Sequence, residues 1–97
     1  MANRLSSSAF DRIARALADP QRCAILERAA TGGELCCSSM AERAKVTQAT
    51  ISHHLKELAG AELLERRKQG QFAYYKFRSE TMDAYLGELE RRLKLTR

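Results

Sequence analysis

The sequence predicts a mainly α-helical domain with one β-hairpin, an α+β fold in which five helices surround a small core. Apolar residues recur at helical spacing along most of the 97-residue chain, which is typical of amphipathic helices. Residues 63–77 depart from that spacing, because strand-forming residues there flank a short turn that contains glycine. A serine cluster, an Asp-Pro pair and a Gly-Gly pair mark where the first helices begin and end.

Size and charge limit the class of protein. We expect one domain over residues 1–97, and 44% hydrophobic with 30% charged residues is typical of a soluble globular protein. No apolar run approaches a membrane span, and the N-terminus lacks the apolar stretch of a secretory signal, so we expect a cytoplasmic protein with no membrane partner. The net charge of +5 favours a polyanionic partner, although charge alone does not separate nucleic-acid binders from other basic proteins.

Capping signals define the first two helices. Serines 6–8 supply N-caps for a helix whose apolar stripe is Phe10, Ile13, Ala14 and Leu17. Asp19 is a good N-cap for the second helix, and Pro20 suits its first position because that N–H would have no partner. The second helix ends at glycines 32–33, which suit a left-handed C-cap, and its apolar side carries Cys23, Leu26 and Ala30.

A short third helix is expected at about 38–45, where it buries Met40, Ala41 and Ala44. The connection at 44–46 is tight, and a helix over 47–59 follows at once. Two helices joined by three or four residues form a helix-turn-helix, in which the second helix reads DNA.

The helix over 47–59 has two different faces. Ile51, Leu55 and Leu58 lie on one apolar stripe, and Thr47 is an N-cap whose free helical N–H groups suit a phosphate. The opposite side is small, hydroxylic or cationic, which fits a DNA major groove. Gln48 suits bidentate recognition of adenine, and Ala49 suits a thymine methyl group. The groove-facing residues are predicted to be Thr47, Gln48, Ala49, Thr50, Ser52, His53 and Lys56.

Two adjacent histidines lie in this helix. Neighbouring helical residues point about 100° apart, so His53 and His54 do not have the spacing of metal ligands. His53 projects opposite Ile51 and is a candidate for a base or phosphate contact. His54 lies at the edge of the apolar stripe, where it either braces the helix or holds one phosphate.

The hairpin at 63–77 carries Arg66, Arg67 and Lys68 in sequence with no acid between them, and Gln71 follows at its turn. A basic hairpin behind a recognition helix is typical of the wing of a winged helix-turn-helix, here with two strands. We expect these four residues to position the protein through phosphates, which set affinity more than sequence choice. The alternative is a solvated hairpin end that contacts nothing.

The last helix, from Ser79 to about Leu95, has more apolar residues than a terminal helix of a small domain needs. We expect a homodimer, because two-fold proteins read two half-sites about one helical turn apart and gain affinity by doing so. The alternative is that these helices cover only the monomer's own core. The predicted dimer surface is Phe10, Ile13 and Leu17 with Met82, Tyr85, Leu86, Leu89 and Leu93.

From Phe10 to Phe77 the order of elements resembles the ArsR/SmtB family of bacterial winged-helix repressors. The resemblance is carried by Leu17–Arg22, Ile25–Leu26, Gly33–Cys36, Thr47–Leu58 and Gly70–Tyr75. It implies a homodimer joined through its first and last helices, with the recognition helix in the major groove of an operator, that represses transcription.

The sensing chemistry of that family transfers less well. Members that sense arsenic or cadmium carry Cys-x-Cys at the start of the third helix, whereas here Cys36 matches the first thiolate and Ser38 occupies the second position. Zinc-sensing members use histidine and carboxylates on the last helix, and this last helix contains no histidine.

Three cysteines do not form a tidy disulfide framework. Cys36 and Cys37 are adjacent and could share a soft ion, but a closed site needs further ligands. Cys23 is separated from them by about 15 Å of helix, which argues against a three-thiolate site within one subunit, whereas ligands from a partner subunit could complete such a site. We therefore favour structural cysteines and no cofactor, with a metal or metalloid inducer as the alternative.

A different class of function is a small helical module that binds another protein without binding DNA. The groove-facing side lacks the exposed aromatic or methionine anchor that a protein interface has at its centre, which argues against it. An enzyme is not expected, because the sequence has no glycine-rich phosphate loop, no catalytic triad and no paired carboxylates in apolar surroundings. We therefore expect a partner of double-stranded DNA that is not an enzyme.

Overall fold

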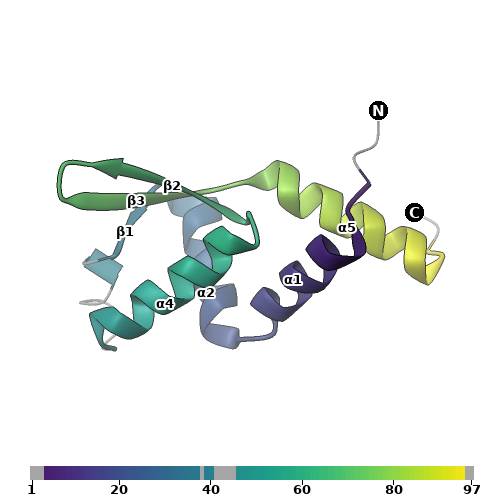
Figure 1. Cartoon of the computed structure of the whole chain (residues 1–97), viewed down its shortest axis with the longest axis horizontal. Coiled ribbons are helices and arrows are strands. Elements are labelled where there is room, and N and C mark those ends of the chain that lie inside the picture. The colour runs from purple at the N-terminus through teal and green to yellow at the C-terminus, as the bar shows by residue number, and fades with distance from the viewer. Residues whose placement is uncertain (1–3, 38, 41–45, 96–97) are drawn as a thin grey trace.

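The computed structural model describes residues 4–37, 39–40 and 46–95. Within those residues the hairpin lies at one end of the molecule and the last helix at the other, with the first helix beside the last (Figure 1). The elements are α1 (Ser7–Leu17), α2 (Pro20–Gly32), β1 (Leu35–Cys36), α4 (Gln48–Gly60), β2 (Leu64–Gln69), β3 (Phe72–Phe77) and α5 (Ser79–Leu93).

The predicted N-caps are confirmed. The side chains of Ser6, Asp19 and Thr47 each accept a hydrogen bond from a backbone N–H in the first turn of the following helix, at 2.8–3.1 Å. Pro20 occupies the first turn of α2, and Gly33 follows the helix with a φ of 86°, a conformation that favours glycine. Local sequence signals therefore set the start of α1, α2 and α4.

The sheet has three strands in the order β1-β3-β2, all antiparallel, rather than the two predicted. Leu35 pairs with Tyr75 and Cys36 with Tyr74, so β1 covers the second edge of β3. A two-residue strand has no detectable period in the sequence, which is why it was missed. Of the predicted third helix, positions 38 and 41–45 lie outside the described residues, and residues 37, 39 and 40 are helical. The five predicted helices therefore correspond, within the described ranges, to the four helices α1, α2, α4 and α5 and to this short helical segment.

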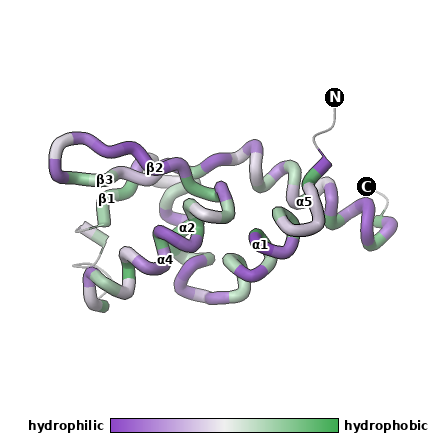
Figure 2. The backbone as a smooth tube through the Cα atoms, viewed as in Figure 1, coloured by the Kyte–Doolittle hydropathy of each residue, from purple (hydrophilic) through white to green (hydrophobic). Residues whose placement is uncertain are grey.

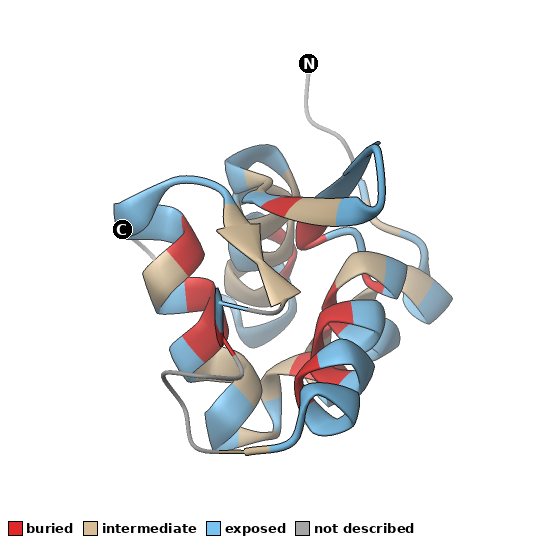
Figure 3. Cartoon of the chain, turned by 90° about the vertical axis from the view of Figure 1, so that its left-hand side faces the viewer, coloured by how far each residue is buried: buried red, intermediate tan, exposed pale blue. Residues whose placement is uncertain are grey.

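The core lies between the inner faces of the helices and the base of the hairpin. Figure 3 shows the buried segments of the helices turned toward the middle of the molecule. The predicted apolar stripe of α4 is confirmed, since Ile51, Leu55 and Leu58 are at most 3% exposed. The buried apolar residues are Ile13, Ala16, Ile25, Leu26, Ala29, Met40, Ile51, Leu55, Leu58, Ala61, Leu63, Leu64 and Tyr75.

Two sequence predictions about buried faces need correction. Ile13, predicted at the dimer surface, is 1% exposed and belongs to the core of its own chain. The buried face of α2 is formed by Ile25, Leu26 and Ala29, whereas Ala30 is exposed. In α1 the core takes Ile13 from the predicted stripe together with Ala16, and in α2 it takes Leu26 from the predicted side together with Ile25 and Ala29. None of the helices in the described ranges is long and apolar enough to cross a membrane.

Candidate nucleic-acid interface

The first turns of α4 present a polar, uncharged surface. Its N-cap Thr47 and the predicted groove-facing residues are all exposed, and the first turn contains no acidic residue. The hydroxyls of Thr47 and Thr50 are 2.8 Å apart, so the cap is held by two threonines. The nearest carboxylate along the helix, Glu57, follows after two further turns. The exposed predicted residues are Thr47, Gln48, Ala49, Thr50, Ser52, His53 and Lys56.

His54 lies apart from that surface. It is 6% exposed, and its Nε2 is 2.8 Å from Oε1 of Gln21 on α2. Of the two roles that the sequence left open, the structure shows the bracing one, because a buried ring bonded within the protein has no path to a phosphate. His54 therefore joins α4 to α2.

The three cationic side chains of the hairpin lie on both faces of the sheet. Arg66, Arg67 and Lys68 are consecutive residues of β2, opposite Tyr75, Tyr74 and Ala73 of β3. Successive side chains of a strand point to opposite faces, so Arg66 and Lys68 share one face and Arg67 occupies the other. Figure 2 shows β2 as a hydrophilic strand along the hairpin, in keeping with the exposure of all three side chains.

A cleft of about 390 Å³ joins α4 to the hairpin. Gln48 and Ser52 line it from α4, while Arg66 and Gln71 line it from the hairpin. Residues predicted separately from a helix and from a hairpin thus meet at one surface. No local pattern in the sequence predicts the rest of the lining, which is Cys36, Cys37, Phe72, Ala73 and Tyr75.

Arg67 is held on the opposite face of the sheet. Its Nη2 and Nε donate to the carboxylate of Glu34 at 2.8 and 3.1 Å, and its Nη1 donates to Oε1 of Gln69 at 2.6 Å. The guanidinium also lies 4.9 Å from the ring centre of Tyr74. The hydrogen bonds from Arg67 lower the pKa of Glu34, and Glu34 in turn raises the pKa of Arg67. Arg67 is therefore engaged within the chain.

The thiols have structural surroundings. Cys37 donates to the backbone oxygen of Gln48 at 3.8 Å, and burial, reinforced by the neighbouring Cys36, raises its pKa. Cys23 donates to the backbone oxygen of Leu17 at 3.1 Å and so ties α2 to the end of α1. Within the described ranges, no three histidine, cysteine or acidic side chains come together as a metal site.

The far end of the molecule carries the predicted dimer surface. Phe10 of α1 stacks on Tyr85 of α5 with ring centres 5.0 Å apart, and Arg92 covers the Phe10 ring at 3.8 Å. Leu86 and Leu93 are 47% and 61% exposed, Phe10 and Leu89 are half-buried, and Leu17, Met82 and Tyr85 pack against the core. The surface that remains open is thus narrower than predicted and centres on α5.

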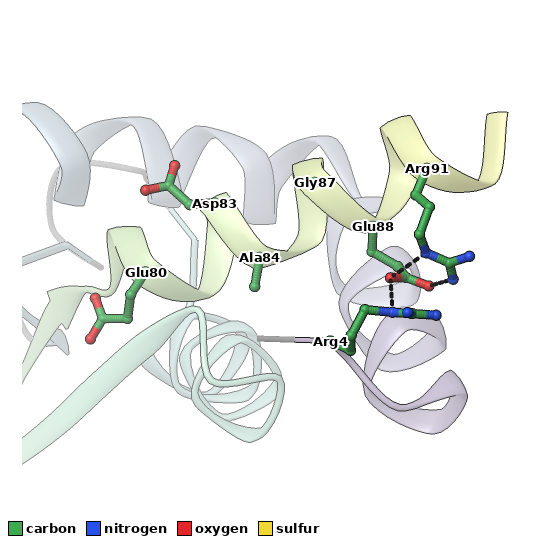
Figure 4. A pocket seen from close by; sticks show the side chains of 7 residues that line it. All are labelled: Arg4, Glu80, Asp83, Ala84, Gly87, Glu88 and Arg91. Atoms are coloured by element: carbon green, nitrogen blue, oxygen red, sulfur yellow. Dashed lines mark hydrogen bonds and ion pairs between the residues drawn. The ribbon is translucent and has the colours of Figure 1, made fainter. Parts of the chain in front are cut away.

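A buried carboxylate holds this end together. Glu88 is 5% exposed, and Arg91, Arg92 and Arg4 surround it, with Nε of Arg92 at 3.0 Å and Nε of Arg4 at 3.7 Å. Figure 4 shows Arg4 and Arg91 directed at Glu88, whereas Glu80 and Asp83 line the far end of the same pocket of about 390 Å³. The hydrogen bonds from Arg91, then those from Arg92, lower the pKa of Glu88 to about 2.

The known proteins that this chain resembles in sequence and in structure are helix-turn-helix transcriptional regulators. Residues 17–67 match the family model described as a helix-turn-helix domain. The chain is 35% identical over 79 residues to the arsenical resistance operon repressor of Staphylococcus xylosus, covering 81% of this chain and 75% of that protein. It is similar to the crystal structure of an ArsR family transcriptional regulator, with a TM-score of 0.81, 25% identity and 98% and 95% of the two chains covered. An ArsR-like transcriptional regulator from Rhodococcus sp. RHA1 matches with a TM-score of 0.77, 27% identity and coverage of 87% and 78%.

Proposed function

This chain belongs to the ArsR family of winged helix-turn-helix transcriptional regulators, and we propose that it represses transcription by binding operator DNA as a homodimer. The observation that carries the proposal is the cleft where the acid-free first turns of α4 meet Arg66 and Gln71 of the hairpin. A helix buried on one face and polar on the other, beside a basic hairpin, suits a major groove and its flanking phosphates. Such a partner places the protein in the cytoplasm.

We propose that α4 enters the major groove with its N-terminal turns. Gln48 then reads adenine through two hydrogen bonds, and Ala49 contacts a thymine methyl group. On the hairpin, the face that carries Arg66 and Lys68 lies against the backbone. His54 and Arg67 are left out of the proposed contact surface, because each is bonded within the chain. The proposed contacts are Thr47, Gln48, Ala49, Thr50, Ser52, His53, Lys56, Arg66, Lys68 and Gln71.

We propose that a second copy of the chain covers α5. Leu86 and Leu93 are exposed large apolar residues on this helix, next to the stacked pair Phe10 and Tyr85. A symmetric contact through this face leaves both copies of α4 and both hairpins free for two half-sites.

We propose no resident cofactor and no metalloid response for this member of the family. Supporting this, Ser38 stands where a second thiolate would be needed, and the raised pKa of Cys37 leaves less of its thiolate to bind a metalloid. Cys36 and Cys37 then serve as part of the packing beneath the N-terminus of α4.

A binding titration tests the proposed function. Fluorescence anisotropy would compare a labelled duplex from upstream of the protein's own gene with a shuffled duplex of the same composition. We expect tighter binding to the first duplex and a loss of affinity for both as salt increases. Absence of binding to either duplex at low salt would contradict the proposal and favour a protein-binding module instead.

A further inference from the structure

The feature that the proposed function does not use is the ion pair between Glu34 and Arg67. It is bidentate, and the third edge of the guanidinium donates to Gln69 while Tyr74 covers one of its faces. A guanidinium has a fixed fork of donors, so these contacts hold it in one orientation. A phosphate would have to displace Glu34 or Gln69 to bind Arg67.

The two partners of this pair connect distant parts of the chain. Glu34 lies between the end of α2 and β1, directly after Gly33, and Arg67 lies in β2, 33 residues further on. The other end of α2 holds α4 through the hydrogen bond between Gln21 and His54. The start of α2 therefore contacts α4, and the residue that follows the end of α2 by two positions contacts the hairpin.

We propose that Arg67 is a positioning residue and that the Glu34–Arg67 pair sets where the hairpin lies relative to α4. The pair fixes β2 from behind, so that Arg66 and Lys68, on the other face, meet the phosphates beside the groove in which α4 lies. The inference rests on the proposed function, since it assigns a role within DNA binding. It also replaces the expectation that all three hairpin cations bind phosphate.

Each role predicts a different response to mutation. If Arg67 is a positioning residue, removing either partner weakens binding because the hairpin must then be ordered on the DNA, while Arg66 and Lys68 still reach their phosphates. If Arg67 binds phosphate, its loss lowers the salt dependence of binding, as the loss of Lys68 does. If Glu34 instead holds Arg67 back from the DNA, neutralising Glu34 tightens binding and steepens the salt dependence.

The experiment is a salt titration of anisotropy on a labelled mixed-sequence duplex, with the full chain. The variants are E34Q, R67Q, the charge-retaining R67K, the matched control K68Q on the adjacent residue, and the exchanged pair E34R with R67E. Thermal melting of each variant establishes that it is folded before its binding is compared.

We expect E34Q, R67Q and R67K each to weaken binding about two- to fivefold at the lowest salt, the range typical of an exposed ion pair. Their slopes of log affinity against log salt should equal that of the wild type. K68Q should lower the slope by about one unit for each hairpin in contact with phosphate. The exchanged pair should recover most of the affinity that the single changes lose.

Three results would overturn the inference: a slope for R67Q as low as that of K68Q, tighter binding by E34Q, or unchanged affinity in all Glu34 and Arg67 variants. In each of these cases the wild type still binds DNA, so the proposed function stands. If the wild type binds no duplex at low salt, the proposed function fails and the inference fails with it. If R67Q does not fold, E34Q decides between the roles, because it breaks the pair while all three hairpin cations remain: weaker binding supports the positioning role, and tighter binding contradicts it.

Discussion

Gln21 of α2 and His54 of α4 are hydrogen-bonded at 2.8 Å across 33 residues of sequence. Because the amide oxygen of Gln21 only accepts, the imidazole Nε2 donates. His54 is buried, and its second ring nitrogen, Nδ1, has no hydrogen-bond partner within the described part of the chain. The contact therefore fixes α4 against α2 through a single bond whose loss leaves a buried donor unsatisfied.

Replacing Gln21 by Ala should lower the free energy of unfolding by about 1–3 kcal/mol, the usual cost of a buried polar group that has lost its partner. Chemical denaturation monitored by circular dichroism measures this change. Gln48→Ala is the control, since Gln48 is exposed and should leave stability within about 0.5 kcal/mol of the wild type. Equal stability of the two variants would show that the bond to His54 is dispensable.

Gln48→Ala should instead change base preference. We expect a loss of about 1–3 kcal/mol on the operator, confined to duplexes that keep the adenine Gln48 reads. Binding to a panel of operators, each with one base pair changed, measures it. An equal loss on operator and shuffled DNA would mean that Gln48 contributes affinity but no sequence readout.

Leu86→Glu should disrupt the proposed dimer. A symmetric interface places the new charge twice in an apolar contact, so we expect the dimer dissociation constant to rise about tenfold or more. Sedimentation equilibrium measures it. Phe72→Glu is the matched control, because Phe72 is similarly exposed, at 45% against 47%, but lies at the turn of the hairpin. A dimer that is unaffected by Leu86→Glu would place the interface elsewhere.

Stability in acid should depend on Glu88. Its pKa is lowered from 4.5 to about 2 in the folded protein, so the unfolded chain binds more protons between these values. The stabilisation is therefore complete above pH 4.5 and is lost as the pH falls toward 2. In Glu88→Gln the melting temperature should fall less steeply over this range than in the wild type. Glu57→Gln, on the exposed side of α4, should keep the wild-type profile, and a match between the Glu88 and Glu57 variants would refute the role of Glu88.

Arsenite should not release the reduced protein from DNA. Cys36 and Cys37 supply two adjacent thiols, and Cys23 is engaged with the backbone of Leu17. Titrating arsenite into the protein–DNA complex and following anisotropy tests this expectation. Release by arsenite in the wild type that is absent from Cys36→Ser would instead assign the metalloid response to this thiol.

The parts of the fold with local signals could be predicted from the sequence. Ser6, Asp19 and Thr47 announce helix starts because a capping side chain acts within three residues of its own position. The apolar stripe of α4 and the turn of the hairpin are likewise local. This information was enough to place the exposed face of α4 and the hairpin.

What could not be predicted depends on contacts between distant residues. Arg67 looks like its neighbours in the sequence, and only the fold brings Glu34 to it. Ile13 has the spacing of the predicted dimer surface, but in the fold its side chain is buried in the core of its own chain. The strand β1 forms because Leu35 and Cys36 pair with the edge of β3 that β2 leaves open. Nothing in the identity of these two residues predicts that pairing.

The alternation of β2 has a consequence for the length of the hairpin. Deleting one residue such as Glu65 would shift every later side chain of the strand to the opposite face. Arg67 would then turn toward the groove of α4, while Arg66 and Lys68 would turn toward Glu34. The shortened chain would keep Arg66, Arg67 and Lys68 but present them to the duplex with the two faces of the strand exchanged. The number of residues before these cations, and not only their positive charge, therefore decides which of them face the DNA.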